Sequence, residues 1–101
     1  MKKIVNYFIT MFQGWDKYGT KGSRCVGYFP KYSEAREEVI NNALDIYEDG
    51  YYPYAVIEAV EPGIYSICEV PIFFKFNKET KKYEPIECPE ELRIFRGFGI
   101  G

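Results

Sequence analysis

The fold is decided by residues 33–60, which read SEAREEVINNALDIYEDGYYPYAVIEAV. The first part repeats apolar side chains at helical spacing, with acidic side chains on the opposite side. Ser33 is placed to cap the first turn of this helix, and Gly50 is placed to end it at about Asp49. The second part, Tyr54–Val60, is rich in residues that favour a strand. The apolar side of the predicted helix contains Ala35, Val39, Ile40, Ala43, Leu44, Ile46 and Tyr47.

Strand patterns flank this stretch on both sides. Before it, Ile4–Phe12 carries apolar side chains on both faces, which predicts an inner strand. Arg24–Phe29 is placed to pair with that strand as a hairpin. After the stretch, Ile72–Phe76 and Lys82–Ile86 flank a polar turn and predict a second hairpin.

These elements predict an α+β fold in a single domain over residues 1–101. The order is strand, strand, helix, strand, strand, strand, so one main helix packs on a mostly antiparallel sheet of about five strands. Pro71 and Pro85 place the second hairpin toward a sheet edge, and Pro89 begins a short helix. The second sheet face is rich in Tyr and Phe and has no obvious cover. Either the C-terminal hairpin and tail cover it, or a partner subunit does.

The composition indicates a folded protein that binds neither nucleic acid nor membrane. The chain has 13 basic and 15 acidic residues, and its basic runs are no longer than a pair of lysines, whereas a phosphate-backbone binder needs a clustered basic surface. The chain contains no stretch approaching the roughly 20 apolar residues of a membrane span. Asn6, Thr10 and Gln13 interrupt the apolar N-terminal stretch, which argues against a signal peptide. We therefore expect a cytoplasmic protein.

Residues for the common catalytic and metal sites are missing from the sequence. The chain has no histidine, which removes the commonest general base and the commonest metal ligand. Cys25, Cys68 and Cys88 share no CxxC spacing, so neither a disulfide framework nor a zinc site is indicated. Glu58 alternates with apolar residues and is expected on the exposed side of its strand. We predict no enzymatic activity, no metal and no cofactor.

The connection between the first two strands, GWDKYGTKGSR (14–24), is longer than a typical hairpin turn, and long connections are often functional. It does not match the GxxxxGK[ST] phosphate-binding loop. Trp15 and Tyr18 are suited to stacking on a base, and Asp16 is able to accept hydrogen bonds from a ring or a ribose. In a purely structural alternative, the glycines only permit tight turns and Trp15 caps the core.

Groups for binding a phosphate lie at the end of this connection, and a tyrosine cluster adds further polar groups. Arg24 is able to fork onto a phosphate, and the backbone of Gly22 and Ser23 is able to form an anion-binding nest. The run YYPY, which contains Tyr52 and Tyr54, places hydroxyl groups at one end of the sheet. In the structural alternative, this run is an aromatic edge over the end of the helix.

Two segments, GWDKYGTKGSRCVGYF (14–29) and NNALDIYEDGYYPYAVIE (41–58), resemble a family of small uncharacterised proteins of clostridia-type bacteria and their phages. The resemblance covers nearly the whole chain. The family pattern has a Gly/Trp loop, a GSRxVGYF-like strand, a helix with paired asparagines and a YxYAVIE-like strand. Small phage proteins of this kind resemble inhibitors of host immunity. The positions that match the family pattern are Trp15, Ser23, Arg24, Asn42, Glu48 and Tyr54.

We expect a non-catalytic, phage-encoded binding protein in the host cytoplasm, which inhibits bacterial immunity by sequestering a nucleotide-like signal. The 14–24 connection and nearby tyrosines hold the ligand, and Asp16 or Asn42 selects its hydroxyl groups or ring edges. We expect a homo-oligomer. The alternative is a protein–protein inhibitor or structural module that acts through the aromatic sheet face or the acidic helix face. A third hypothesis is an enzyme that uses Cys25 or a carboxylate.

Overall fold

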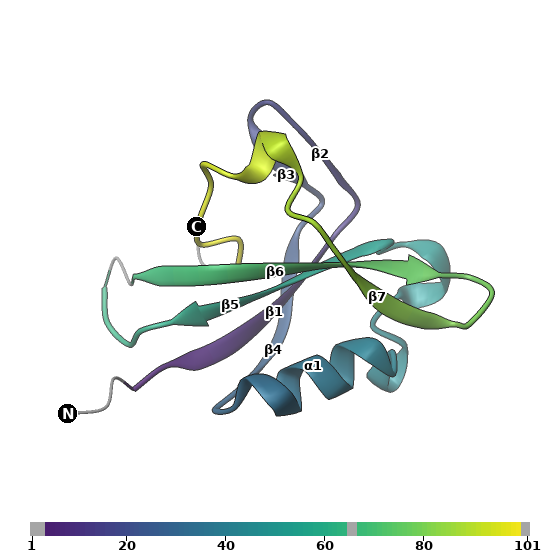
Figure 1. The fold of residues 1–101 in the computed structure, drawn as a ribbon, viewed down its shortest axis with the longest axis horizontal. Helices are drawn as coiled ribbons and strands as arrows, with labels where there is room; N and C mark the ends of the chain where they lie inside the picture. The colour runs from purple at the N-terminus through teal and green to yellow at the C-terminus, as the bar shows by residue number, and fades with distance from the viewer. Residues whose placement is uncertain (1–3, 65–66, 100–101) are drawn as a thin grey trace.

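The computed structural model describes residues 4–64 and 67–99, whose strands form a large and a small sheet. The large sheet has five antiparallel strands in the order β4-β1-β5-β6-β7, and helix α1 lies across one of its faces (Figure 1). The prediction of a single α+β domain with a mostly antiparallel sheet is confirmed. The strands are β1 (Asn6–Phe12), β2 (Gly14–Asp16), β3 (Gly19–Lys21), β4 (Arg24–Phe29), β5 (Tyr54–Val60), β6 (Cys68–Asn77) and β7 (Lys82–Ile86). The helices are α1 (Tyr32–Ile40) and the 3₁₀ turns η1 (Ala43–Asp45), η2 (Glu48–Gly50) and η3 (Glu90–Leu92).

Strand β1 lies between β4 and β5 and forms the predicted hairpin with β4. Its side chains alternate between the two faces of the sheet. Ile9 and Met11 face α1, Thr10 and Phe12 face the opposite side, and all four are buried. The prediction of an inner strand is therefore confirmed, and the sheet has a core on each side.

The helix-side core lies between α1 and the sheet. Helix α1 buries Ala35 and Val39, which stand one turn apart on its inner side. Tyr52 and Tyr83 are buried in the same cluster, where the hydroxyl of Tyr83 donates a hydrogen bond to the backbone carbonyl of Tyr52. Burial raises the pKa of the Tyr83 hydroxyl well above its ordinary value. The other buried members are Ile9, Met11, Ala55, Ile57 and Phe74.

Helix α1 is shorter than predicted. It begins at Tyr32, so the predicted cap, Ser33, lies inside the first turn. It ends at Ile40 because Asn42 has a left-handed backbone (φ 50°) and its side chain accepts a hydrogen bond from the backbone N–H of Tyr47 at 2.9 Å. The residues that follow form two 3₁₀ turns with further left-handed positions at Leu44, Asp45, Glu48 and Asp49. The prediction of one helix as far as Asp49 is wrong, because a local side-chain hydrogen bond competes with the helical one.

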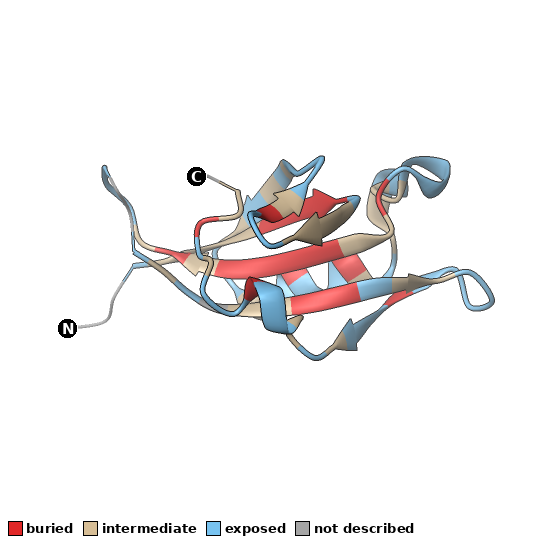
Figure 2. Ribbon diagram, turned by 90° about the horizontal axis from the view of Figure 1, so that it is seen from above, coloured by how far each residue is buried: buried red, intermediate tan, exposed pale blue. Residues whose placement is uncertain are grey.

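The second face of the sheet is covered by two segments of the same chain. The β2–β3 hairpin and residues 87–99, which we call the tail, lie on the side opposite α1 (Figure 1). Phe12, Val56 and Phe73 of the sheet pack there against Leu92 of the tail. Figure 2, seen from this side, shows buried positions along the central strands and exposed ones at the turns. The tail covers this face as one alternative expected, but the hairpin beside it is β2–β3, because the C-terminal hairpin β6–β7 belongs to the sheet itself. The chain therefore supplies its own second layer, and a homo-oligomer stays a prediction. The partly buried residues around this cluster are Trp15, Tyr54, Ile86, Cys88, Phe95 and Phe98.

The prolines of the second hairpin occupy two different places. Pro85 lies in β7, an edge strand of the described sheet, as predicted. Pro71 lies in β6, which has a neighbour on each side, at the point where the β5–β6 register shifts between Ile57 and Ala59. This irregularity lies opposite Glu58. Pro71 is tolerated there because the extra residue of a bulge stays out of the hydrogen-bond ladder.

Candidate ligand-binding site

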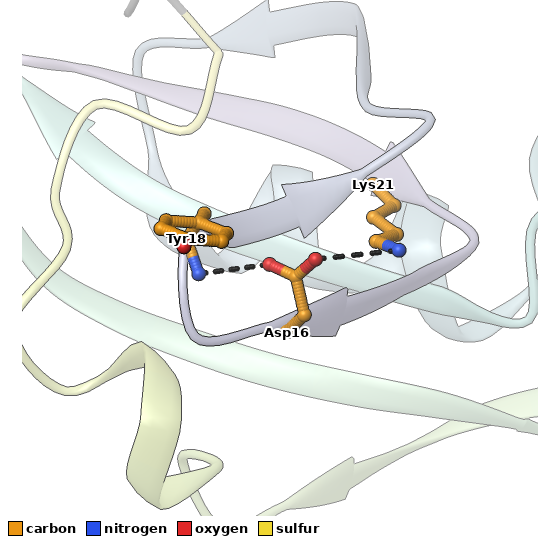
Figure 3. Close-up of polar contacts among 3 residues, drawn as sticks. All are labelled: Asp16, Tyr18 and Lys21. Carbon is orange, nitrogen blue, oxygen red and sulfur yellow. Dashed lines mark hydrogen bonds and ion pairs between the residues drawn. The ribbon is translucent and has the colours of Figure 1, made fainter.

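The glycine-rich segment 14–24 folds as a short hairpin and not as an open loop. Strands β2 and β3 form it, and Asp16 closes the turn by accepting a hydrogen bond from the backbone N–H of Tyr18 at 2.8 Å (Figure 3). The other carboxylate oxygen of Asp16 lies 3.3 Å from Nζ of Lys21 (Figure 3). The hydrogen bond from Tyr18 holds the pKa of the Asp16 carboxyl below its ordinary value. Both oxygens of Asp16 therefore have partners within the hairpin, and Asp16 stabilises its turn.

Trp15 of the β2–β3 hairpin contacts both the sheet and the tail. Its indole N–H donates a hydrogen bond to Oε2 of Glu91 at 2.6 Å. Its ring centroid lies 6.3 Å from that of Phe12 and 5.0 Å from that of Tyr54. Tyr54 in turn stacks on Phe12 at 5.4 Å. The structure brings the predicted residues Trp15 and Tyr54 together, but in the arrangement of the structural alternative, in which Trp15 caps the core.

A pocket of about 220 Å³ lies between the hairpin and the tail, and we call it the hairpin–tail pocket. Tyr18 is 78% exposed at this site. Phe95 and Phe98 supply apolar surface, and Arg96 supplies a positive charge. The pocket therefore combines aromatic rings, hydroxyl groups and a guanidinium. Its lining residues are Tyr18, Gly19, Thr20, Ser23, Phe95, Arg96, Gly97 and Phe98.

Arg96 is held in place by its own turn. Its Nη1 donates hydrogen bonds to the backbone carbonyls of Arg93 (2.9 Å) and Phe95 (2.7 Å). A guanidinium has five N–H donors, so further donors remain for a ligand. Arg96 is also exposed, so a ligand is able to reach it. Arg96 therefore occupies the position, beside Tyr18 and Ser23, that was predicted for Arg24.

Glu58 anchors the tail to the sheet. It is 1% exposed, and its two carboxylate oxygens accept hydrogen bonds from the backbone N–H groups of Gly97 and Phe98, both at 2.8 Å. The prediction that Glu58 faces solvent is wrong, because it shares a sheet face with Val56 and the tail covers that face. Burial raises the pKa of the Glu58 carboxyl, while the hydrogen bonds from the tail and the charge of Arg96 act in the opposite direction. Glu58 therefore positions the tail residues that line the pocket.

Glycines allow the tail to approach the sheet closely. Gly97 has a left-handed φ of 75°. A Cβ added at Gly99 would lie 2.6 Å from Oγ1 of Thr10 and 3.4 Å from Cβ of Cys25. The hydroxyl of Thr10 is itself buried and has no hydrogen-bond partner among the residues that the structure describes. The motif RGFG (96–99) is thus the sequence signal for this contact. The site residues that were not predicted from the sequence are Glu58, Phe95, Arg96, Gly97 and Phe98.

The predicted phosphate-binding residues separate in the structure. Ser23 lines the hairpin–tail pocket. Gly22 has a left-handed φ of 62° and turns the chain toward β4. Arg24 pairs in register with Met11, whose side chain lies in the helix-side core. Paired residues of neighbouring strands share a face, so Arg24 belongs to the face opposite the tail. Of these three residues, only Ser23 reaches the pocket.

Asn42 and Tyr52 lie away from the hairpin–tail pocket. Tyr52 is buried in the helix-side core. Asn42 lines a larger pocket of about 490 Å³. The residues that line it come from the segment after α1 and from the connection of β6 to β7, which lie at the same end of the molecule (Figure 1). We call it the turn pocket. Its lining residues are Asn42, Asp45, Tyr47, Asp49, Gly50, Phe76, Lys78 and Lys81.

Comparisons with known proteins do not assign the chain to a family. No family model, curated protein or solved structure matches it. Within residues 4–64 and 67–99, no group of three or more Cys, Asp or Glu side chains is arranged to hold a metal ion. The same residues include no helix that is long and apolar enough to cross a membrane. The resemblance to phage-associated proteins and the expected lack of catalysis both stay predictions.

Proposed function

We propose that this chain is a non-catalytic binding protein that sequesters a nucleotide-like ligand in the hairpin–tail pocket. The observation that carries the proposal is the meeting of Tyr18 and Ser23 with Arg96 in one pocket. Aromatic rings, hydroxyl groups and arginine are groups with which proteins hold bases, sugars and phosphates. The sequence predicts the same kinds of group in the ligand site, but with Arg24 and Trp15. In the pocket, Arg96 replaces Arg24, and the phenylalanines of the tail replace Trp15.

The size of the pocket limits how such a ligand is held. Its volume of about 220 Å³ lies below the roughly 300–1,000 Å³ that is typical of sites enclosing a drug-sized ligand. We therefore place only the flat base inside, against Phe95 and Tyr18. The phosphate lies at the exposed Arg96, and the hydroxyl groups of Ser23 and Thr20 bond the sugar.

The residues of the pocket favour binding over chemistry. The sequence contains no histidine. The described residues of the lining include no carboxylate and no thiol, the other usual bases and nucleophiles. The carboxylate of Glu58 lies under the tail and already accepts two backbone hydrogen bonds. A protein of this kind acts by sequestering its ligand from the receptors that would otherwise bind it.

The setting that we propose is inhibition of host immunity by a phage protein in the host cytoplasm. Its support is the resemblance to phage-associated proteins. The alternative, a protein–protein inhibitor, loses part of its support because the hairpin and tail cover the aromatic sheet face. It then depends on the acidic side of α1, where Glu34, Glu37 and Glu38 are exposed.

Titration with mono-, di- and cyclic nucleotides tests the proposed function. Calorimetry and the fluorescence of Trp15, the single tryptophan, report binding. We expect saturable binding that Arg96→Gln weakens by about tenfold or more, because charge-assisted hydrogen bonds to the phosphate are lost. Arg24→Gln is the matched control and should bind as the wild type does, because Arg24 lies on the other face of the sheet.

Absence of saturable binding by every nucleotide contradicts the proposal. Equal weakening by the two arginine variants also contradicts it, because the effect then follows the net charge and not the pocket. Since Arg96 bonds the backbone of its own turn, thermal unfolding of Arg96→Gln checks that the tail stays in place. If charge reversal at Glu34 and Glu37 abolishes inhibition in cells while Arg96→Gln retains it, the protein–protein alternative is correct.

A further inference from the structure

We propose a second ligand site in the turn pocket, which takes a small zwitterion of the amino-acid or short-peptide class. This site is separate from the hairpin–tail pocket and does not depend on the function proposed for it. Its volume of about 490 Å³ lies within the roughly 300–1,000 Å³ typical of ligand pockets. Two segments build it, residues 42–50 after α1 and residues 76–81, which end β6 and form the turn to β7. Both ribbon views place these segments at the same end of the molecule (Figures 1 and 2).

Tyr47 and Phe76 form the aromatic floor of the turn pocket. Their rings stack with centroids 3.7 Å apart and planes inclined by 12°. Tyr83 packs against Phe76 from the core, at 5.1 Å between ring centroids. The floor is therefore fixed by the core beneath it. An aromatic face attracts both apolar groups and cations.

Asp45 and Asp49 form the acidic wall. Asn42 orders this wall, because its Nδ2 donates a hydrogen bond to Oδ1 of Asp45 (3.2 Å) and its Oδ1 accepts one from the backbone N–H of Tyr47 (2.9 Å). Asp45 and Asp49 both have left-handed φ values, 53° and 52°. Among the described residues, neither carboxylate has a lysine or arginine at ion-pair distance. Both are therefore available to a positively charged group.

Lys78 and Lys81 form the basic wall. Asn77 orders this turn, because its side chain accepts a hydrogen bond from the backbone N–H of Glu79 (2.9 Å) and its carbonyl accepts one from Lys81 (2.8 Å). Within the part of the chain that the structure describes, no carboxylate pairs with Lys78 or Lys81. Both ammonium groups are therefore available to an anion.

The two walls together define the class of ligand. A simple anion is attracted by the lysines but repelled by the aspartates. A simple cation is attracted by the aspartates but repelled by the lysines. A zwitterion satisfies both walls, with its carboxylate at Lys78 and Lys81 and its ammonium at Asp45 and Asp49. Amino acids and short peptides carry these two charges and add a side chain for the aromatic floor.

Calorimetric titration of the 101-residue chain with free α-amino acids and glycine-containing dipeptides tests this site. We expect saturable binding by at least one of these probes. The N-acetyl and the C-terminal amide derivatives of that probe each lack one charge. Each should bind the wild type about tenfold or more weakly than the parent.

Paired variants assign the effect to the two walls. Lys78→Gln with Lys81→Gln, and Asp45→Asn with Asp49→Asn, should each weaken binding by about tenfold or more. Asparagine tolerates the left-handed backbone at both aspartate positions, so the second pair should fold. The matched control replaces Lys75 and Lys82, exposed lysines outside the pocket lining, by Gln and should bind as the wild type does.

Several outcomes would overturn the proposal. If none of the probes binds, the proposal of a ligand site in the turn pocket is wrong. An N-acetyl derivative that binds as tightly as its parent shows a plain anion site, because the acidic wall then contributes nothing. Equal weakening in the control pair shows a general charge effect. Because the derivative probes act on the wild type, these conclusions do not depend on the folding of any variant.

Discussion

At the scale of single residues, Glu58 joins the middle of the sheet to the tail. Its carboxylate accepts backbone hydrogen bonds from residues that lie 39 and 40 positions later in the chain. Two short hydrogen bonds to one buried charge fix the tail more firmly than apolar contacts alone, because they also specify direction. The wall of the hairpin–tail pocket, including Arg96, depends on this contact.

Glu58 should make the stability of the protein depend on pH. Burial raises the pKa of its carboxyl above the ordinary 4.5, so the folded chain binds this proton more tightly than the unfolded chain does. The resulting stabilisation is complete below pH 4.5 and is lost as the pH rises through the raised pKa. We therefore expect the free energy of unfolding of the wild type, minus that of Glu58→Gln, to fall over this interval. The fall is about 1.4 kcal/mol for each tenfold difference in proton affinity.

Urea unfolding of both proteins at a series of pH values measures this difference. Glu58→Gln serves as the reference because its amide does not ionise while the other titrating groups are unchanged. A difference that stays flat or rises with pH contradicts the prediction. It would show that the hydrogen bonds from the tail outweigh the effect of burial on the carboxyl.

Two of the residues that line the candidate site, Tyr18 and Ser23, are named as ligand-binding residues from the sequence, and the lining residues of the tail are not. Tyr18 and Ser23 lie in the segment 14–24, whose length and composition mark it as functional. Arg96 lies more than seventy positions from Ser23 along the chain, so its approach depends on the whole fold. Glu58 alternates with apolar residues in the sequence, a pattern typical of an exposed side chain. It is buried only because the tail covers it.

At the scale of elements, Asn42 ends the helix and begins the 3₁₀ turns. The apolar spacing of the helix continues past this residue, so the pattern alone predicts a longer helix. The left-handed backbone of Asn42 and its side-chain hydrogen bonds to Asp45 and Tyr47 interrupt it. Asparagine suits this role because its short amide side chain bonds the local backbone.

Substitution of Asn42 separates these two contributions. Asn42→Ala should lower the free energy of unfolding by about 1–3 kcal/mol, because it removes both hydrogen bonds and places alanine in a left-handed conformation. Asn42→Gly removes the same hydrogen bonds but tolerates the backbone, so it should cost less. Chemical unfolding measures both variants. If both variants lose the same free energy of unfolding, the left-handed backbone contributes nothing, and the loss comes from the hydrogen bonds alone.

Strands are predicted more accurately than the segments between them. The bounds Arg24–Phe29, Tyr54–Val60 and Lys82–Ile86 agree with β4, β5 and β7. Their patterns are local, because apolar and β-branched residues favour a pleated, half-buried surface. The short β2–β3 hairpin is missing from the prediction. Its strands span three residues each, too few for a recognisable alternation.

At the scale of the whole molecule, one sheet separates two cores. The helix-side core contains Met11, and the core under the tail contains Leu92, and both residues are fully buried. Strands β1 and β5 contribute residues to both clusters. Loss of packing on one side therefore weakens the sheet on which the other side depends, and the domain should unfold as one unit.

Met11→Ala and Leu92→Ala test this coupling. Each should lower the free energy of unfolding by about 2–5 kcal/mol, the usual cost of truncating a buried Met or Leu. Far-ultraviolet circular dichroism and the fluorescence of Trp15, which packs by the second core, should report the same midpoint in each variant. A fluorescence transition that precedes the circular dichroism transition in Leu92→Ala would show that the tail unfolds independently.

The sequence by itself determined the α+β class, the inner strand β1 and the lack of histidine chemistry. These properties depend on residue types and on neighbours in the chain. Only the tertiary structure decided what covers the second sheet face, that Glu58 is buried, and that Arg96 lies in one pocket with Tyr18. The physical reason is that these features are contacts between distant segments. The free energy that selects them comes from burying the tail against the sheet, which local patterns of residues do not record.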